Sequence, residues 1–189
     1  KSIGYGLLFF HDVAGDGKFR TLELQLNASN QFKLTSDSSN LLRVGLNFGL
    51  NHRQINWNNL YFDSQYNGYM FDPSAPTFEN YQNDKKTNYS WGIGALYEWI
   101  KNKRFSVISG IGAFNLNQPN QGFYNQEIKR DVRYSFFSKG TFQLDRQWDI
   151  IPSAQLSFQG VYRELIIGSS AKYYLRSDLG DYKALYGGL

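Results

Sequence analysis

The sequence predicts an all-β fold, a transmembrane antiparallel β-barrel built as an up-and-down meander, and three observations support this prediction. Apolar and polar residues alternate along one segment after another. Charged residues make up only 19% of the chain while aromatic residues reach 17%, and short and long connections alternate between the segments. Outer-membrane barrels combine these features because one face of each strand meets lipid and the other meets a polar interior. We therefore expect residues 1–189 to form a single outer-membrane barrel domain.

The composition argues against several other classes of protein. The aromatic content is too high and the charge too low for a disordered chain. No apolar run approaches the ~20 residues that a membrane-spanning helix needs. The absence of Cys excludes a disulfide framework, a thiol nucleophile and a Cys-ligated metal. The formal net charge of +4 is not gathered into a basic stripe, so nothing favours nucleic acid as a partner.

Three segments show the alternation most clearly: residues 21–34, 42–53 and 89–99. In the first, apolar side chains occupy every even position from Leu22 to Leu34 except Asn30, so they share one face of an extended strand. In the third, aromatic residues stand at both ends of the apolar row, as they do in the girdles at two membrane interfaces.

Six weaker signals bring the expected number of strands to nine. They cover residues 3–10, 105–116, 132–144, 150–159, 165–175 and 184–189. Single-chain bacterial barrels have an even number of strands, and an open edge in lipid leaves backbone groups without hydrogen-bond partners. The sequence is thus expected to be an incomplete barrel, or one whose edges another chain covers.

A soluble β-sandwich or lipocalin-like barrel would also show alternating strands. The polar faces argue against it, because they are rich in Gly, Ser, Asn and Gln rather than in the Lys and Glu of a solvated surface. Several segments are also longer than the roughly 5–6 residues usual in soluble sheets. The membrane barrel is therefore the preferred fold.

The connections alternate in length along the chain. Tight polar turns are expected at residues 36–40, 101–103 and 145–147, and longer connections at 11–18, 55–88 and 117–130, with the short 160–163 connection as an exception. Transmembrane barrels have short turns at the periplasmic end. This assigns five turn residues to that end: Asp37, Lys101, Lys103, Asp145 and Arg146. On the polar faces of the strands, the candidate lumen-facing residues are Arg43, Asn47, Arg53, Arg133 and Lys139.

No group of residues forms a recognisable catalytic or metal-binding motif. His11 and Asp12 lack an activated Ser and oxyanion donors, so we interpret them as ordinary residues at the start of a loop, and His52 as an amphipathic ring at the membrane interface. Four acidic residues lack the spacing of a calcium loop: Asp63, Asp72, Glu79 and Asp84. The segment Ala14-Gly15-Asp16-Gly17-Lys18 lacks the ending of a phosphate loop and indicates a turn. The sequence thus predicts no enzyme, no cofactor and no metal site.

The connection 55–88 is the most distinctive segment of the chain. It is dense in aromatic residues: Trp57, Tyr61, Phe62, Tyr66, Tyr69, Phe71, Phe78 and Tyr81. Aromatics together with Asn and Ser make good contact surface, and loops of this length are usually functional or disordered. Two interpretations stay open, a protein-docking surface or lumen plug on the one hand and a self-packed cap on the other.

Four motifs follow one another over most of the chain. They are Phe9-Phe10-His11-Asp12-Val13-Ala14-Gly15-Asp16-Gly17-Lys18-Phe19, then residues 57–68 followed by Asp72-Pro73-Ser74, then Leu116-Asn117-Gln118-Pro119-Asn120-Gln121, and finally Ile151-Pro152-Ser153. In their order and spacing they resemble the PorP/SprF family, outer-membrane proteins of the Bacteroidetes type IX secretion system. None of them is a catalytic signature. The family's Asn/Pro-rich opening region and final strands have no counterpart here.

The resemblance implies an outer-membrane barrel that serves protein export and, in gliding bacteria, adhesin secretion and motility. It implies partners in the periplasm, namely a ring-forming lipoprotein complex and a peptidoglycan-binding lipoprotein, besides outer-membrane lipid. The expected function is thus a non-catalytic scaffold of the secretion machinery. An outer-membrane pore or small-molecule transporter is the alternative, with an anion preference set by inward-facing Arg and Lys side chains. A lipid-modifying or proteolytic enzyme that relies on His11 and the loop carboxylates is a third hypothesis.

Overall fold

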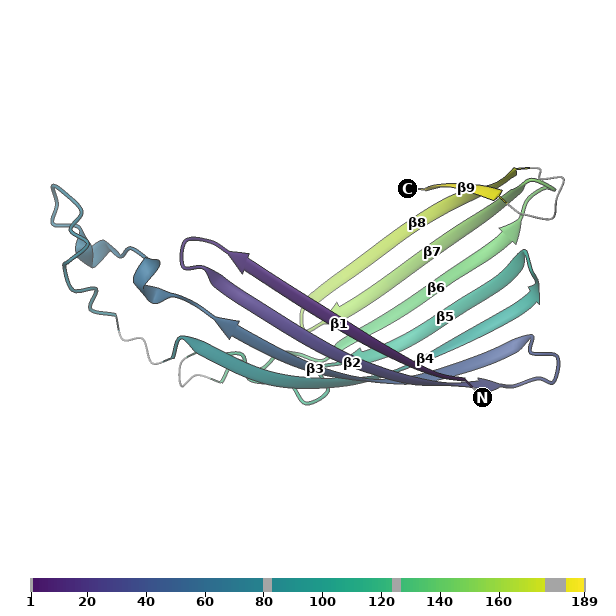
Figure 1. The fold of residues 1–189 in the computed structure, drawn as a ribbon, viewed down its shortest axis with the longest axis horizontal. Helices are drawn as coiled ribbons and strands as arrows, with labels where there is room; N and C mark the ends of the chain where they lie inside the picture. Colours follow the sequence, from purple (N-terminus) through teal and green to yellow (C-terminus); the bar gives the residue numbers. More distant parts are fainter. Residues whose placement is uncertain (1, 80–82, 124–126, 176–182, 189) are drawn as a thin grey trace.

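The computed structural model describes residues 2–79, 83–123, 127–175 and 183–188. Nine strands within these ranges form one antiparallel sheet (Figure 1). Its strands are β1 (Ser2–Ala14), β2 (Phe19–Lys33), β3 (Asn40–Gln54), β4 (Lys85–Asn102), β5 (Phe105–Phe114), β6 (Arg133–Gln143), β7 (Trp148–Gln159), β8 (Tyr162–Leu175) and β9 (Lys183–Gly188). Two 3₁₀ turns, η1 (Trp57–Asn59) and η2 (Asp63–Gln65), lie between β3 and β4. Each strand pairs with the next along the chain. The predicted all-β meander is therefore confirmed.

The alternating sequence gives the sheet two different faces, which we call the apolar face and the polar face. Leu24 lies opposite Leu50, which lies opposite Tyr89, so apolar side chains continue from strand to strand on one side. The intervening residues, such as Gln25 and Ser90, form the other side. The two faces are thus distinct across β2, β3 and β4, while β1 also carries apolar residues such as Leu8 and Phe10 on the polar side.

Most large apolar side chains of the sheet are exposed rather than packed into a core. Leu46 and Ile93 on the apolar face are 62% and 48% exposed, whereas Leu41 is the one buried hydrophobic residue in the described part of the chain. An apolar surface of this extent needs an apolar medium or a partner to cover it. None of the helices in the described ranges has the length and apolar character of a membrane span.

The predicted long connection at residues 11–18 is wrong. β1 continues to Ala14, which pairs with Phe19, and leaves a tight turn in which Lys18 N donates to the Gly15 carbonyl at 3.0 Å. Gly15 has φ +67°, a conformation that costs glycine little. Backbone pairing in a hairpin does not require apolar side chains, so the polar pair His11 and Asp12 does not end the strand. The other strands lie where the sequence predicts them, although β4 begins at Lys85 and the long loop is therefore 55–84.

The connections define two ends of the sheet. The turn end holds the short β2–β3, β4–β5 and β6–β7 turns, and the loop end holds the β1–β2 hairpin, the long loop, the connection 115–132 and the two-residue β7–β8 turn. Figure 1 shows a strongly curved sheet with β1 and β9 as its free edges. The nine described strands curve without closing on themselves, so the barrel itself stays a prediction.

Candidate functional site

The polar face of β2, β3 and β4 carries a hydrogen-bonded row centred on Arg43. Its Nε donates to Oε1 of Gln31 at 2.7 Å and its Nη2 to Oε2 of Glu98 at 2.9 Å, so one side chain links three strands. Nearby, Nδ2 of Asn47 donates to Oδ1 of Asn27 at 2.8 Å. Because Glu98 lies 2.9 Å from the guanidinium, Arg43 is a neutralised cation.

A hollow of about 560 Å³ lies over this face, and glycines form much of its floor. At Gly92, just beside it, a Cβ would lie 2.7 Å from the carbonyl oxygen of Ala113. The Phe114 ring lies close to Gly92 and Gly112, and the guanidinium of Arg133 lies 4.7 Å above that ring. The glycines leave room for the Phe114 ring to lie flat on the sheet. The ring in turn holds the Arg133 guanidinium by a cation–π contact.

Arg53 is held at the loop end of the polar face. Its Nη2 donates to the Gln121 carbonyl at 3.4 Å, and its guanidinium lies 6.0 Å from the Phe123 ring. Phe123 also meets Phe19 edge to face, with ring centroids 6.2 Å apart. Gln121 and Phe123 of the connection between β5 and β6 therefore lie against this end of the polar face.

The five candidate lumen-facing residues share the polar face but do not form one site. Arg43 and Asn47 lie in the hydrogen-bonded row, Arg133 stacks on Phe114, and Arg53 lies against the connection 115–132. Lys139 faces the same side and makes no hydrogen bond or ion pair with any residue the structure describes. That this face lines a lumen stays a prediction.

The five predicted turn residues, Asp37, Lys101, Lys103, Asp145 and Arg146, are all exposed at the turn end. Oδ1 of Asp37 accepts the backbone N–H of Ser39 at 3.0 Å, and this hydrogen bond is the main reason that the pKa of Asp37 is lowered to about 2. The Lys101 ammonium lies 5.4 Å above the Phe105 ring. These side chains are thus available to a partner at this end.

No pattern in the sequence points to a tightly bonded group at the turn end that is centred on Arg104 in the β4–β5 turn. Its Nε donates to Oδ1 of Asp149 at 2.8 Å, and Asp149 is fully buried. Its Nη1 and Nη2 donate to the carbonyls of Arg146 and Asp145, each at 2.8 Å. The hydrogen bond with Asp149 raises the pKa of Arg104 above its already high ordinary value. We call this group the Arg104 clamp.

Tyr174 of β8 completes the Arg104 clamp. Its hydroxyl donates to Oδ2 of Asp149 at 2.8 Å, and the Arg104 guanidinium lies 4.6 Å above its ring. Three elements that are far apart in the sequence are therefore joined at the turn end. The clamp fixes the position of the β6–β7 turn relative to the β4–β5 turn.

The long loop packs against itself and projects away from the sheet (Figure 1). Gln65 is buried, and its Nε2 donates to the carbonyls of Pro73 and Ala75, each at 3.3 Å. The rings of Tyr61 and Phe71 meet edge to face at 4.9 Å, whereas Tyr69 is 94% exposed. The geometry agrees with the self-packed interpretation. Tyr81, counted among the loop aromatics, lies outside the described residues.

The residues considered for chemistry are not brought together. His11 and Asp12 are neighbours on one strand and therefore point to opposite faces of β1. Nδ1 of His52 forms a hydrogen bond with Oγ1 of Thr87 at 2.8 Å. In the ranges that the structure describes, no three His, Cys, Asp or Glu side chains gather to hold a metal ion, and this includes Asp63, Asp72, Glu79 and Asp84. The carboxylate of Asp72 instead accepts from Ser74, which lowers the pKa of Asp72.

Comparison with known proteins gives one family. The model of the type IX secretion system membrane protein PorP/SprF matches residues 1–186. No curated protein and no solved structure matches the chain.

Proposed function

Because the chain belongs to the PorP/SprF family of type IX secretion system membrane proteins, we propose that it is a non-catalytic outer-membrane scaffold for protein export and gliding motility. The observation that carries the proposal is the two-faced sheet. Its apolar face is exposed along β1 to β8, while its polar face holds hydrogen-bonded side chains and a hollow. Outer-membrane barrels need this division between lipid and interior.

The strand order supports a barrel that includes further strands. In an antiparallel meander of nine strands, β1 and β9 run in the same direction, so they cannot pair antiparallel with each other. Lipid does not tolerate unpaired edges. We therefore propose that an odd number of additional strands, from this polypeptide or another, closes the barrel.

The turn end supports the scaffold role. Short turns of transmembrane barrels face the periplasm, which would place Asp37, Lys101, Lys103, Asp145 and Arg146 on that side. The Arg104 clamp holds two of these turns in a fixed arrangement, and a preorganised surface binds with a smaller entropic cost. The proposed partners there are the ring-forming and peptidoglycan-binding lipoproteins of the secretion system.

The test is deletion of the gene followed by an assay of secreted cargo in the culture medium. We expect cargo to accumulate in the cell and to be secreted again when the full-length gene is restored. Normal secretion in the deletion strain would overturn the proposal.

A second experiment tests which end of the sheet contacts the periplasmic partners. It crosslinks from Lys103 in cells and uses Lys86, at the opposite end of β4, as the matched position. Crosslinks to a periplasmic lipoprotein from Lys103 alone are expected.

A pore is the second candidate function, and the hollow over the polar face favours it. Steady conductance of the purified full-length protein in planar bilayers would support a pore. The neutralisation of Arg43 by Glu98 removes one of the cations that would set an anion preference. We therefore expect any such channel to prefer anions less strongly than four free cations would make it, with the preference left to Arg53, Arg133 and Lys139.

A further inference from the structure

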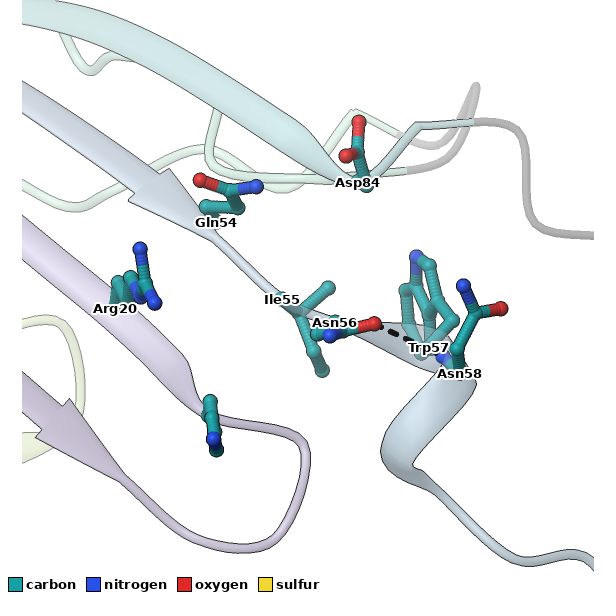
Figure 2. Close-up of a pocket in the computed structure, with 8 residues that line it drawn as sticks. Arg20, Gln54, Ile55, Asn56, Trp57, Asn58 and Asp84 are labelled. Atoms are coloured by element: carbon teal, nitrogen blue, oxygen red, sulfur yellow. Dashed lines mark hydrogen bonds between the residues drawn. The ribbon is translucent and has the colours of Figure 1, made fainter.

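A recess of about 330 Å³ opens at the loop end, between the β1–β2 hairpin and the start of the long loop (Figure 2). Packing at Gly17 fixes its shape. Gly17 is buried against the side chains of Leu60 and Ile55, and its carbonyl accepts the backbone N–H of Asn56 at 2.8 Å. The hairpin and the loop therefore form one continuous wall around the recess.

Polar side chains make up most of the lining of the recess, and three of them are amides, which accept as well as donate hydrogen bonds. Lys18 and Arg20 supply two cations, and Gln54 and Asn58 supply amide groups. None of these four side chains has a hydrogen-bond or ion-pair partner in the part of the chain that the structure describes. Asp84 is the one carboxylate in the lining, and Figure 2 shows Gln54 between it and Arg20. The recess thus has an excess of positive charge and unused donors.

We propose that this recess binds a phosphate group. Lys offers a point charge and Arg a planar fork, and together with neighbouring amide donors they match the several acceptor oxygens of a phosphate. The phosphate of a lipid headgroup and free inorganic phosphate share this chemistry. No covalent step is involved.

The position of the recess favours the lipid headgroup. Arg20 lies on the same face of β2 as Leu24, four residues further toward the loop end, which is about 13 Å along the strand. Gln54 lies opposite Arg20, and Lys85 lies opposite Gln54, so the apolar face turns polar and basic at this level. Basic residues just outside an apolar band lie at the height of anionic headgroups. The choice of lipid rests on the proposed membrane location, whereas the phosphate site itself does not.

The experiment compares the wild type with the Lys18→Gln/Arg20→Gln variant, using full-length protein. The matched control is Lys103→Gln/Arg146→Gln, which removes one Lys and one Arg at the turn end. One arm measures inorganic phosphate by equilibrium dialysis in detergent. The other arm uses phosphatidylcholine nanodiscs with or without lipid A, and native mass spectrometry counts the retained lipid.

We expect the recess variant to bind phosphate at least about tenfold more weakly than the wild type and the control, because it lacks both charged donors. Loss of retained lipid A in the same variant identifies a headgroup; equal lipid retention in all three proteins identifies free phosphate as the source. The Lys18→Arg/Arg20→Lys variant keeps both charges and should keep binding, which guards against a folding defect. Equal phosphate binding by the wild type and the recess variant would overturn the proposal, as would no binding by the wild type in either arm. These measurements do not depend on cargo secretion. A failure of the phosphate site is therefore distinguishable from a failure of the proposed secretion role.

Discussion

Nε of Arg104 in the β4–β5 turn donates to Oδ1 of Asp149 in β7 at 2.8 Å, and Asp149 is fully buried. A buried carboxylate without a cationic partner is costly. The β4–β5 and β6–β7 turns are therefore coupled through one side chain that crosses from one turn to the next.

Substitution of Arg104 by Ala should lower the free energy of unfolding by about 2–4 kcal/mol, because it leaves the Asp149 charge buried and unpaired. The measurement is reversible urea unfolding in detergent, followed by Trp fluorescence. Lys129→Ala is the control, because Lys129 pairs with Glu127 at 3.1 Å on an exposed surface. That pair should change the free energy by less than about 1 kcal/mol. Equal effects of the two substitutions would contradict the role given to the Arg104 clamp.

Substitution of Tyr174 by Phe keeps the ring beneath Arg104 and removes only the hydroxyl that donates to Asp149 at 2.8 Å. The expected loss is about 1–3 kcal/mol, since the bond is made to a charged acceptor. Tyr173→Phe is the matched control, because Tyr173 lies on the other face against Trp148. A double-mutant cycle with Arg104→Ala should show non-additive effects, and strict additivity would argue against a coupled network.

The β2–β3 turn should respond to pH through Asp37, whose pKa is lowered from 3.8 to about 2 by hydrogen bonds from the turn. The folded turn therefore holds its proton less tightly than the unfolded chain does. The stabilisation is fully present above pH 3.8 and is lost as the pH falls through about 2. The check is a ¹³C carboxyl titration of Asp37 by NMR. A midpoint at or above 3.8 would show that the hydrogen bond to Ser39 is not made in solution.

Substitution of Gly92 by Ala should weaken the pairing of β4 with β5. The new Cβ would lie 2.7 Å from the Ala113 carbonyl oxygen, and this backbone atom cannot move without separating the strands. The expected cost is about 1–3 kcal/mol in the same urea experiment. Gly6→Ala is the control, because its Cβ would meet Asn27 at an ordinary 3.6 Å. A cost as large for Gly6→Ala would mean that strand propensity, and not the close contact, decides the effect.

Alternation along the chain predicts β2, β3 and β4 clearly, because a side-chain period of two has one physical cause, a sheet whose faces meet different surroundings. The other strands carry weaker signals, since segments such as 105–116 place apolar residues on both faces. The error at residues 11–18 has the opposite origin. His11 and Asp12 break the apolar pattern, yet β1 continues past them because its backbone bonds to β2 do not depend on side-chain polarity.

The Arg104 clamp could not be found in the sequence. Arg104 and Asp149 are 45 residues apart, and each stands beside an unremarkable polar turn. Only the pairing of β4 through β8 brings these turns to one end and Tyr174 beside them. The recess at the loop end depends in the same way on how the β1–β2 hairpin meets the long loop, a contact made through a glycine that gives no apolar signal.

The connections at the loop end differ greatly in height. β7 and β8 are joined by Gly160 and Val161 alone, whereas the segment between β3 and β4 extends far past the strand ends (Figure 1). The loop end is therefore extended by a long loop beside β3 and β4 and only by a short turn beside β7 and β8. A bulky molecule that approaches the loop end therefore meets the long loop beside β3 and β4 before it reaches the strands, whereas beside β7 and β8 only a two-residue turn stands in its way.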